Sequence, residues 1–485
     1  MRILYLDLDT LRPDHLGCYG YHRDTSPNLD RIASEGVRFD RCYVPNAPCL
    51  PSRSALFTGQ FGIHNNVINH GGTNADPVAE GPSRAFRQRL DRTGWIPCLR
   101  RQGMYPVWVS SFAERHSAFQ TTVGYREIFN PGKGGLESAE EVTPYALNWI
   151  RSNAAQRDNW FLHVNYWDAH TPYRAPEDFG NPFADSPAPE WHTEQIRQAN
   201  WDSYGPHSAH EVTHFDDSPN NWPRHVCRID SMEAWKRWID GYDCGIRYMD
   251  SHIGMLLDAL EEAGVLDDLV IMVSSDHGEN QGELNVYGDH QTADLITSRV
   301  PLLVRWPGIT QPRVDTGFHY QGDWAATMVE LLGGEVPACW DVSSFASAFR
   351  ANQETGRDYL VVEQAAWSCQ RTVLWDNWCL INTYHDGLKN FPPVMLFNAA
   401  EDPHETNNLA AERPEVVSQG LARLAEWQGQ MMLTSRSGID PLFQVISEGG
   451  PLHTRGQLGR YCERLRATGR GHHADALEAR HGKGK

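Results

Sequence analysis

Three short segments, each running straight into a polar turn, constrain the fold of this chain most strongly. Residues 3–8, 159–167 and 269–273 are mostly apolar and show little alternation between apolar and polar side chains. Such strands are typical of the interior of a parallel sheet, where helices cover both faces. In open sheets of this kind, ligands gather beyond the carboxyl ends of the strands. The sequence therefore predicts a doubly covered sheet whose polar turns meet at one edge.

The rest of the chain adds smaller parts to this core. We expect an α/β fold in which one large, mixed but mostly parallel sheet is sandwiched by helices over residues 1–365. Residues 366–433 are predicted to form a smaller C-terminal α+β subdomain with an antiparallel sheet. Residues 177–238 lose periodicity and gather Pro, Asn, Asp, His and Trp, which predicts an ordered cover over the site. The tail, residues 434–485, shows no recognisable chemistry and is expected to contact a neighbouring subunit.

Composition indicates a soluble enzyme. The chain has 485 residues, 40% of them hydrophobic, with a mean hydropathy of -0.54 and no apolar run long enough to cross a bilayer. Its net charge of -19 argues against nucleic acid as a partner but leaves a small anionic substrate possible. The ten cysteines lack paired metal spacing, and the N-terminus lacks a signal-peptide pattern. We therefore expect a cytoplasmic protein with free thiols and no membrane partner.

The stretch from residue 46 to residue 59 carries the most specific chemistry. Cys49 precedes Pro51 and a run of helix formers, which predicts that the cysteine lies at or just before a helix N-terminus. Free amide groups and the helix dipole favour an anion at such a position. Arg53, one turn further on, adds a planar donor suited to tetrahedral oxyanions. The alternative interpretation is a buried structural cysteine beside a surface arginine.

The pattern Cys-x-Pro-Ser-Arg resembles the active-site signature of the type I sulfatases, within the alkaline phosphatase superfamily. In that family a maturation enzyme oxidises the cysteine to formylglycine, whose hydrated aldehyde is the nucleophile. The resemblance implies that Cys49 is this residue, that Arg53 orients it, and that a formylglycine-generating maturation enzyme is a partner. It covers roughly residues 1–430 and implies an alkaline phosphatase-like fold.

Two polar turns resemble the metal-binding turns of the family. The first contains Asp9, but the second of two consecutive aspartates found in many members is Thr10 here. The second, Ser-Asp-His-Gly-Glu, contains Asp276 and His277. The resemblance implies one divalent ion held by Asp9, Asp276, His277 and the modified cysteine, with calcium expected first and magnesium or manganese possible. Asp7 is either a substitute ligand or, as we favour, a structural carboxylate beside a basic neighbour.

Two histidines are predicted to be catalytic. His170 lies in a His-Thr-Pro-Tyr turn that resembles a family segment whose histidine contacts the sulfate. His290 occupies a position that is lysine in many members and that contacts the sulfate and its bridging oxygen. A histidine there is suited to act as the general acid that protonates the leaving alcohol. The alternative is a loop histidine that hydrogen-bonds Asp289 or Asp294.

The family's second signature is the largest departure. Residues 103–113 stand in its place and lack the lysine and histidine that bind sulfate in many sulfatases. We expect Arg115 and His116 to replace the lost positive charge, although both also fit an ordinary surface loop. Three side chains in the loop after the cysteine are also candidates: His64, Asn69 and His70. Of these, Asn69 is predicted to bind the substrate.

The function predicted from these features is hydrolysis of a sulfate monoester by an arylsulfatase-like sulfuric ester hydrolase. A phosphonate monoester or phosphate diester hydrolase is the alternative, because that branch of the superfamily also lacks the lysine and histidine. A non-catalytic binding protein on the same fold is a third interpretation, which the complete set formed by Cys49, Arg53 and the metal turns opposes. We expect a homo-oligomer.

Overall fold

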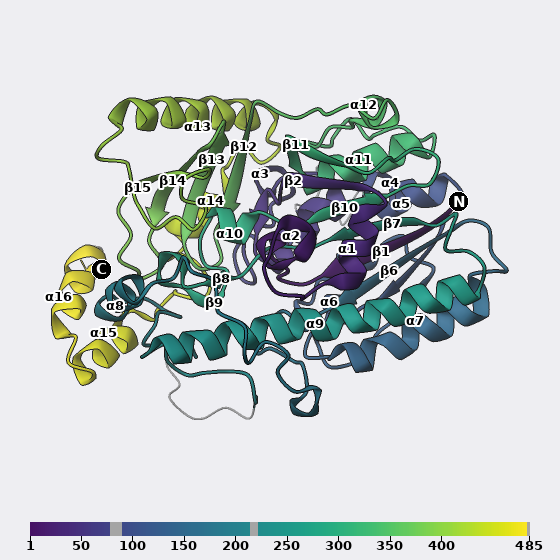
Figure 1. Cartoon of the computed structure of the whole chain (residues 1–485). Coiled ribbons are helices and arrows are strands. Elements are labelled where there is room, and N and C mark those ends of the chain that lie inside the picture. The colour runs from purple at the N-terminus through teal and green to yellow at the C-terminus, as the bar shows by residue number, and fades with distance from the viewer. Residues whose placement is uncertain (78–89, 214–221, 483–485) are drawn as a thin grey trace.

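The computed structural model describes residues 1–77, 90–213 and 222–482 (Figure 1). Its larger sheet has eight strands in the order β11-β2-β10-β7-β1-β6-β4-β5. β10 runs antiparallel to β2 and β7, and the other neighbours are parallel. This confirms the predicted mixed, mostly parallel sheet. In spatial order the strands are β11 (Arg313–Tyr320), β2 (Val37–Tyr43), β10 (Leu302–Arg305), β7 (Val270–Ser274), β1 (Arg2–Leu8), β6 (Trp160–Tyr166), β4 (Tyr105–Val109) and β5 (Glu127–Phe129).

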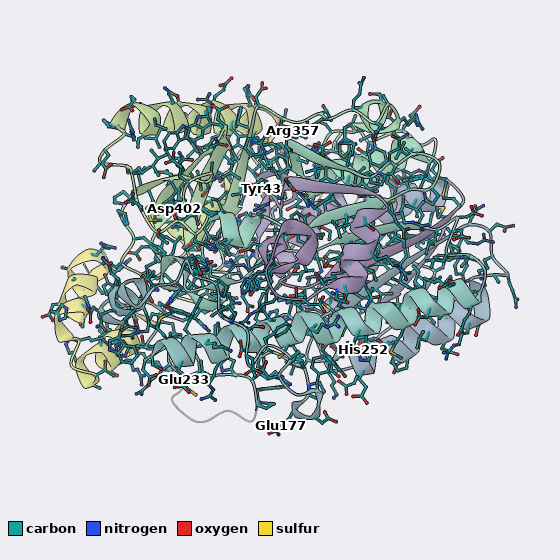
Figure 2. All side chains as sticks on the ribbon, viewed as in Figure 1. Tyr43, Glu177, Glu233, His252, Arg357 and Asp402 are labelled. Atoms are coloured by element: carbon teal, nitrogen blue, oxygen red, sulfur yellow. The ribbon has the colours of Figure 1, made fainter. Side chains whose placement is uncertain are left out.

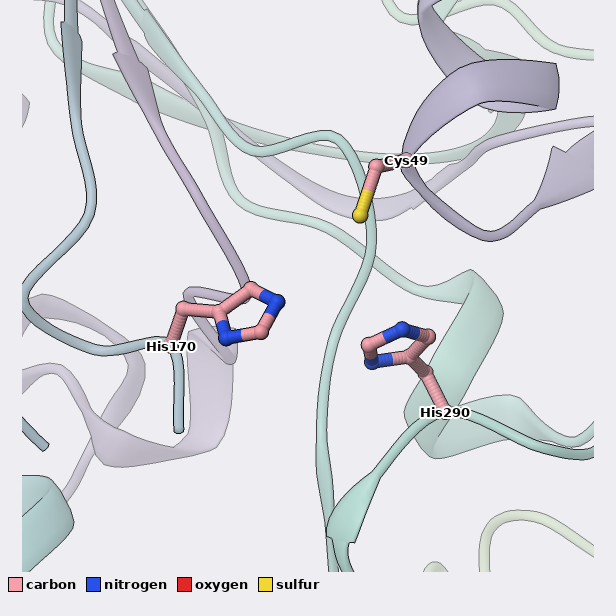
Figure 3. Close-up of side chains that lie close together, drawn as sticks. All are labelled: Cys49, His170 and His290. Atoms are coloured by element: carbon pink, nitrogen blue, oxygen red, sulfur yellow. The ribbon is translucent and has the colours of Figure 1, made fainter. Parts of the chain in front are cut away.

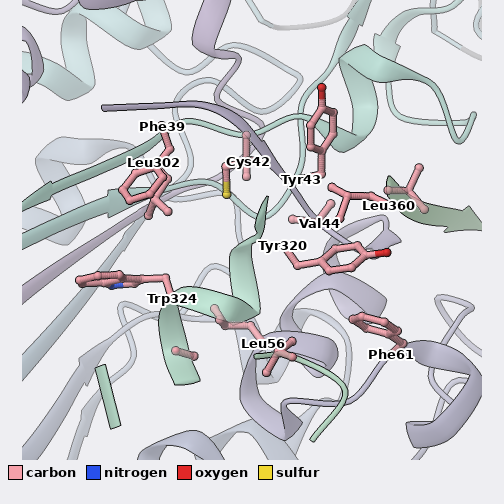
Figure 4. Packing of buried hydrophobic residues seen from close by; sticks show 14 of the residues in the cluster. Phe39, Cys42, Tyr43, Val44, Leu56, Phe61, Leu302, Tyr320, Trp324 and Leu360 are labelled. Atoms are coloured by element: carbon pink, nitrogen blue, oxygen red, sulfur yellow. The ribbon is translucent and has the colours of Figure 1, made fainter. Parts of the chain in front are cut away.

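Helices cover both faces of this sheet, as β1 shows. Ile3 and Tyr5 belong to one buried cluster with residues of α2, α5 and α11, whereas Leu4 and Leu6 belong to another with residues of α1, α7 and α9. Alternate side chains of a strand point to opposite faces, so an uninterrupted apolar strand needs cover on both. Figure 4 shows the first cluster, with Trp324 of α11 beneath the sheet. These helices are α1 (Pro27–Ser34), α2 (Cys49–Thr58), α5 (Trp95–Arg101), α7 (Ala139–Asn153), α9 (Met232–Glu262) and α11 (Gln321–Leu331).

A second, five-stranded sheet has the order β15-β14-β13-β12-β3. Only the β12–β3 pair is parallel, with Glu363 in register with Asn46. This sheet therefore begins upstream of residue 366 and holds the backbone directly ahead of Cys49. Helix α13 (Pro414–Thr434) packs on β13 and β14 (Figure 1). The strands are β3 (Asn46–Ala47), β12 (Tyr359–Gln364), β13 (Cys369–Trp375), β14 (Trp378–His385) and β15 (Val394–Asn398).

Helix α9 is longer than its apolar periodicity predicts. The pattern indicates a helix from Ile246 to Leu260, but the structure extends it back to Met232. Asp243 interrupts the pattern, yet it is buried and is paired with Arg23 at 2.7 Å. His252, further along α9, contacts Thr143 of α7 at 2.9 Å and is labelled in Figure 2. The last residues of the expected cover segment are therefore part of this helix.

The predicted cover segment contains α8 (Glu194–Asp202), and its residues 214–221 lie outside the described part. The tail packs on its own chain, since the Tyr461 hydroxyl accepts a hydrogen bond of 2.5 Å from the amide of Gly205. A subunit contact stays a prediction. Within the described ranges, no helix has both the length and the apolarity that crossing a membrane requires. The remaining elements are α3 (Gly62–Asn65), α4 (Leu90–Thr93), α6 (Phe112–Arg115), β8 (Asn280–Gln281), β9 (Tyr287–Asp289), α10 (Leu295–Ser298), α12 (Ala346–Arg350), α14 (Pro441–Ser447), α15 (Leu458–Ala467) and α16 (Gly471–His481).

Candidate active site

The polar turns meet at the carboxyl ends of the three central strands. β1 pairs in parallel with both β6 and β7, which places Asp7 level with Asn165 and Ser274. The turns that follow these strands are thereby brought to one edge. The four predicted metal ligands gather there, buried, and each offers a ligand atom within 4.8 Å of the others: Asp9, Cys49, Asp276 and His277.

Cys49 is the first residue of α2, as its sequence context predicts. Its side chain is buried, and its Sγ lies 3.0 Å from Nε2 of His277. Burial, followed by the negative charges of Asp9 and Asp276, raises the pKa of the thiol well above its usual value. The unmodified thiol therefore stays protonated and is a poor nucleophile.

The donor set fits a divalent cation. Nδ1 of His277 donates to the carbonyl of Gly278 at 2.8 Å, so Nε2, which lies 3.0 Å from Sγ of Cys49, carries the lone pair that can bind a metal. Oδ1 of Asp9 is buried and has no hydrogen-bond partner among the described residues. Burial and the nearby charge of Asp276 raise the pKa of Asp9 to about 6. A cation between these groups would satisfy the free oxygen and relieve the carboxylate repulsion.

Arg53 binds the carboxylates of the site. Its Nη1 contacts Asp9 at 3.0 Å and also Asp276, and its remaining donors contact Asp7. The guanidinium is buried, so these contacts balance charges that would otherwise be costly. Thr10, at the place of the family's second aspartate, has a buried hydroxyl without a partner in the described chain.

His170 and Arg115 contact each other. Nδ1 of His170 donates to the carbonyl of Thr171 at 2.5 Å, and Nη2 of Arg115 donates to its Nε2 at 3.1 Å. Burial, then the positive charges of Arg115 and Arg174, lower the pKa of His170 well below its usual value. His170 is therefore a neutral ring in one fixed tautomer, and Arg115 remains the charged group.

His290 faces the nucleophile position from the opposite side to His170 (Figure 3). The ligand atoms of Cys49, His170 and His290 lie within 4.8 Å of one another. Nδ1 of His290 is buried without a partner among the described residues, and its Nε2 is 3.7 Å from Asp289, too far for a hydrogen bond. Asp294 instead caps α10. The ring is thus available for the site.

The segment in place of the second signature has a structural role. The hydroxyl of Ser110 donates to Asn165 at 2.9 Å, and that of Ser111 donates to Glu137 at 2.8 Å. His116 reaches the site, but burial and then the charge of Arg115 lower its pKa to about 3. With this pKa the free ring is neutral at physiological pH, and its expected role in binding the substrate stays a prediction.

The loop after α3 presents His70, and not Asn69, to the site. Oδ1 of Asn69 accepts from the amide of His70 at 2.9 Å, and its Nδ2 donates to the carbonyl of Thr73 at 3.2 Å. The Asn69 side chain therefore stabilises the loop in which it lies. His70 instead has a ring nitrogen within 4.8 Å of Cys49 and His116.

His453, from the tail, was not anticipated. Its Nε2 is 3.1 Å from Nδ1 of His70. Only a histidine-rich composition marks this tail in the sequence, and no pattern there indicates a long-range contact.

Comparison with known proteins agrees with this geometry. The sulfatase family model matches residues 2–334. An N-acetylglucosamine-6-O-sulfatase from Bacteroides thetaiotaomicron is 23% identical, covering 88% of this chain and 86% of that protein. A choline-sulfatase from Rhizobium meliloti is 24% identical, with coverages of 83% and 82%.

Solved structures share the fold. A phosphonate monoester hydrolase of Agrobacterium radiobacter superposes with a TM-score of 0.69 at 20% identity, covering 89% of this chain and 96% of that one. A protein in complex with its substrate D-glucosamine-2-N,6-O-disulfate gives a TM-score of 0.68 at 18% identity, with coverages of 89% and 98%. The signature at Cys49, the metal turns and the match over most of the chain lead to one conclusion: this protein belongs to the sulfatase family of the alkaline phosphatase superfamily.

Proposed function

We propose that the chain hydrolyses sulfate monoesters after Cys49 is converted to formylglycine. The observation that carries this proposal is the burial of residue 49 against Asp9, Asp276 and His277 at the first turn of α2. The same three side chains would surround the hydroxyls of a hydrated aldehyde at this position. Conversion of the side chain to formylglycine would supply the nucleophile at this position.

Two groups would complete the site. A divalent ion held by Asp9, Asp276, His277 and residue 49 would supply Lewis-acid stabilisation of charge on the ester oxygens. Calcium is proposed first, since oxygen donors outnumber the imidazole, and manganese or magnesium remains possible. Formylglycine at residue 49 would supply a hydrated aldehyde, with one hydroxyl to attack sulfur and a second to release sulfate.

The chain's own side chains bind the ester and transfer a proton. Arg115, the cation beside residue 49, binds an ester oxygen, and His170 is held by it in a fixed orientation. His290 faces the same space with an unpartnered ring nitrogen and protonates the bridging oxygen as the alcohol leaves. Burial, then neighbouring charged groups, lower the pKa of His290 well below its usual value. The negative charge of the ester must therefore raise this pKa before the ring can act as an acid.

The charge of the site favours a singly charged ester. A bound divalent ion together with Arg53 would balance the charges of Asp7, Asp9 and Asp276, and the pKa values of His116 and His170 are lowered, which leaves Arg115 as the uncompensated cation facing the ester. A sulfate monoester carries one negative charge at neutral pH, whereas a phosphate monoester carries nearly two. The site therefore suits the former.

A phosphonate monoester or phosphate diester hydrolase is the second candidate. These esters also carry one charge, Thr10 removes a carboxylate from the metal turn, and the second signature's basic pair is missing. Similarity to the phosphonate monoester hydrolase of Agrobacterium radiobacter supports this alternative at the level of the fold. Turnover of matched sulfate, phosphonate and phosphate diester substrates distinguishes the two candidates.

Mass spectrometry of the peptide that carries residue 49 tests the nucleophile. Protein made together with a maturation enzyme should contain formylglycine, and specific activity should scale with the converted fraction. Active enzyme that contains only unmodified cysteine would disprove the proposal. A cytoplasmic location, which the sequence predicts, is part of this proposal.

A further inference from the structure

The tail holds a histidine rigidly beside the candidate active site. The backbone amide of His453 donates to the carbonyl of Ala366 at 3.1 Å, and the hydroxyl of Thr454 donates to that of Trp367 at 3.3 Å. The His453 ring stacks on the indole of Trp367, with the ring centroids 4.4 Å apart and the planes 21° apart. Backbone and ring are thus both fixed, and Nε2 is directed at Nδ1 of His70, 3.1 Å away.

The second ring nitrogen of His70 is free for a ligand. Its Nε2 is buried and has no hydrogen-bond partner among the described residues. Because Nδ1 is taken by His453, Nε2 is the nitrogen left for a ligand, and the ring has a nitrogen within 4.8 Å of ligand atoms of Cys49 and His116. A buried polar atom without a partner is costly, and a ligand that accepts its hydrogen removes that cost.

The contact with His453 decides whether this nitrogen donates or accepts. Burial is the largest influence on both rings and lowers both pKa values, so each ring is neutral and carries one hydrogen. If Nε2–H of His453 donates to Nδ1 of His70, the hydrogen of His70 must lie on Nε2. If Nδ1–H of His70 instead donates to Nε2 of His453, Nε2 of His70 carries a lone pair, which would repel the oxygens of an anionic ester. An anion in the site therefore selects the first arrangement.

We propose that His70 donates a hydrogen bond from Nε2 to a non-bridging oxygen of the ester, and that His453 is the positioning residue that stabilises this tautomer through its contact with Nδ1. The inference rests on the proposed function, because it assigns a donor for that same substrate. It explains how the site binds an oxyanion although the basic pair of the second signature is absent.

The test uses mature, metal-loaded enzyme and two measurements. Calorimetry gives the dissociation constant of inorganic sulfate, and steady-state kinetics gives KM and kcat for nitrophenyl sulfate. His70→Ala should weaken sulfate binding roughly 10- to 100-fold, the value of a hydrogen bond to a charged group. His453→Ala should weaken it by about tenfold, because His70 then samples both tautomers. KM should rise more than kcat falls.

A conservative variant separates positioning from packing. In His453→Gln the amide can still donate to Nδ1 of His70, so sulfate binding should recover most of the loss seen in His453→Ala. His472→Ala, on the exposed side of α16, is the matched control and should bind sulfate like the wild type. Thermal unfolding of each variant reports any loss of packing on Trp367.

Two results would overturn the inference. Unchanged sulfate affinity in His70→Ala would show that His70 does not donate a hydrogen bond to the anion. Equal losses in His453→Ala and His453→Gln, with lowered Tm in both, would reduce His453 to a packing residue. Failure of the proposed function has a different appearance, since the wild type would then bind sulfate without hydrolysing sulfate esters.

Discussion

Both carboxylate oxygens of Asp7 accept hydrogen bonds of 3.0 Å from Arg53, one from Nε and one from Nη2. His163 adds a contact of 3.2 Å to Oδ2. Among the described residues, the side chain of Asp9, two residues later, accepts a hydrogen bond only from Nη1 of Arg53, and its Oδ1 has no partner. Two similar aspartates of one strand end thus differ in role, because one is saturated by a guanidinium and the other is available to a metal.

This difference predicts the metal content of two matched variants. Asp9→Asn should lose the bound ion and at least roughly 100-fold in activity, since even residues that only orient metal ligands are worth 10- to 100-fold. Asp276→Ala should behave in the same way. Asp7→Asn should keep the ion but lower the Tm, because it leaves part of a buried guanidinium unpaired.

Elemental analysis of each purified variant, combined with thermal unfolding, checks this prediction. Asp158→Ala, an exposed carboxylate far from the site in the ion pair with Arg2, is the control. Retention of both metal and rate in Asp276→Ala would remove this residue from the proposed metal site.

The proton donor can be tested by varying the leaving group. His290→Ala should lose roughly 10² to 10⁴ in rate on an alkyl sulfate, because expulsion of an alkoxide needs a proton. Nitrophenol leaves without one, so its sulfate should be affected much less. Equal losses on the two esters would show that His290 binds sulfate and does not donate a proton.

Arg115 and His116 are neighbours in sequence but should differ in effect. Arg115→Gln removes the cation that faces the ester and should raise KM roughly 10- to 100-fold. His116→Gln removes a neutral ring and should leave the salt dependence of KM unchanged. KM measured at low and high ionic strength compares the two. A loss of salt dependence in His116→Gln would show that this ring is charged after all.

Lys389 provides a test of burial beside the site. Burial lowers its pKa from 10.5 to about 7, and its Nζ contacts the carbonyl of Pro206. Between these two values the unfolded chain binds one more proton than the folded protein, so this residue makes stability rise with pH. Lys389→Met should remove up to about 1.4 kcal/mol of that rise per pH unit.

Chemical denaturation of the wild type and Lys389→Met across this pH range gives the comparison. The unfolding free energy of the wild type should rise relative to that of Lys389→Met as pH rises from 7 towards 10.5. Parallel profiles would contradict the buried, deprotonated lysine.

Local sequence predicts the parts of the site that lie on strand ends and helix starts. The apolar runs before Asp9 and Asp276 indicate central strands, and parallel pairing then brings the turns together without further information. Cys49 ahead of Pro51 indicates a helix start for the same local reason. These residues are where the sequence and the structure agree.

Contacts between distant segments are not predictable from local patterns. Glu363 pairs with Asn46 beside the nucleophile, and 383 residues separate His70 from His453. Neither contact can be recognised from the periodicity or the composition of the sequence around these residues. The low pKa of His116 is equally hidden, because its largest cause is burial of the ring, which only the folded chain produces.

The most direct test of the account is the specificity of mature enzyme for matched nitrophenyl esters. We predict that kcat/KM is higher for the sulfate monoester than for the phosphonate monoester and the phosphate diester. We also predict that all three activities disappear in Cys49→Ala, made and loaded with metal in the same way. A higher kcat/KM for the phosphonate ester would make the second candidate the function, and full sulfatase activity in Cys49→Ala would contradict the account as a whole.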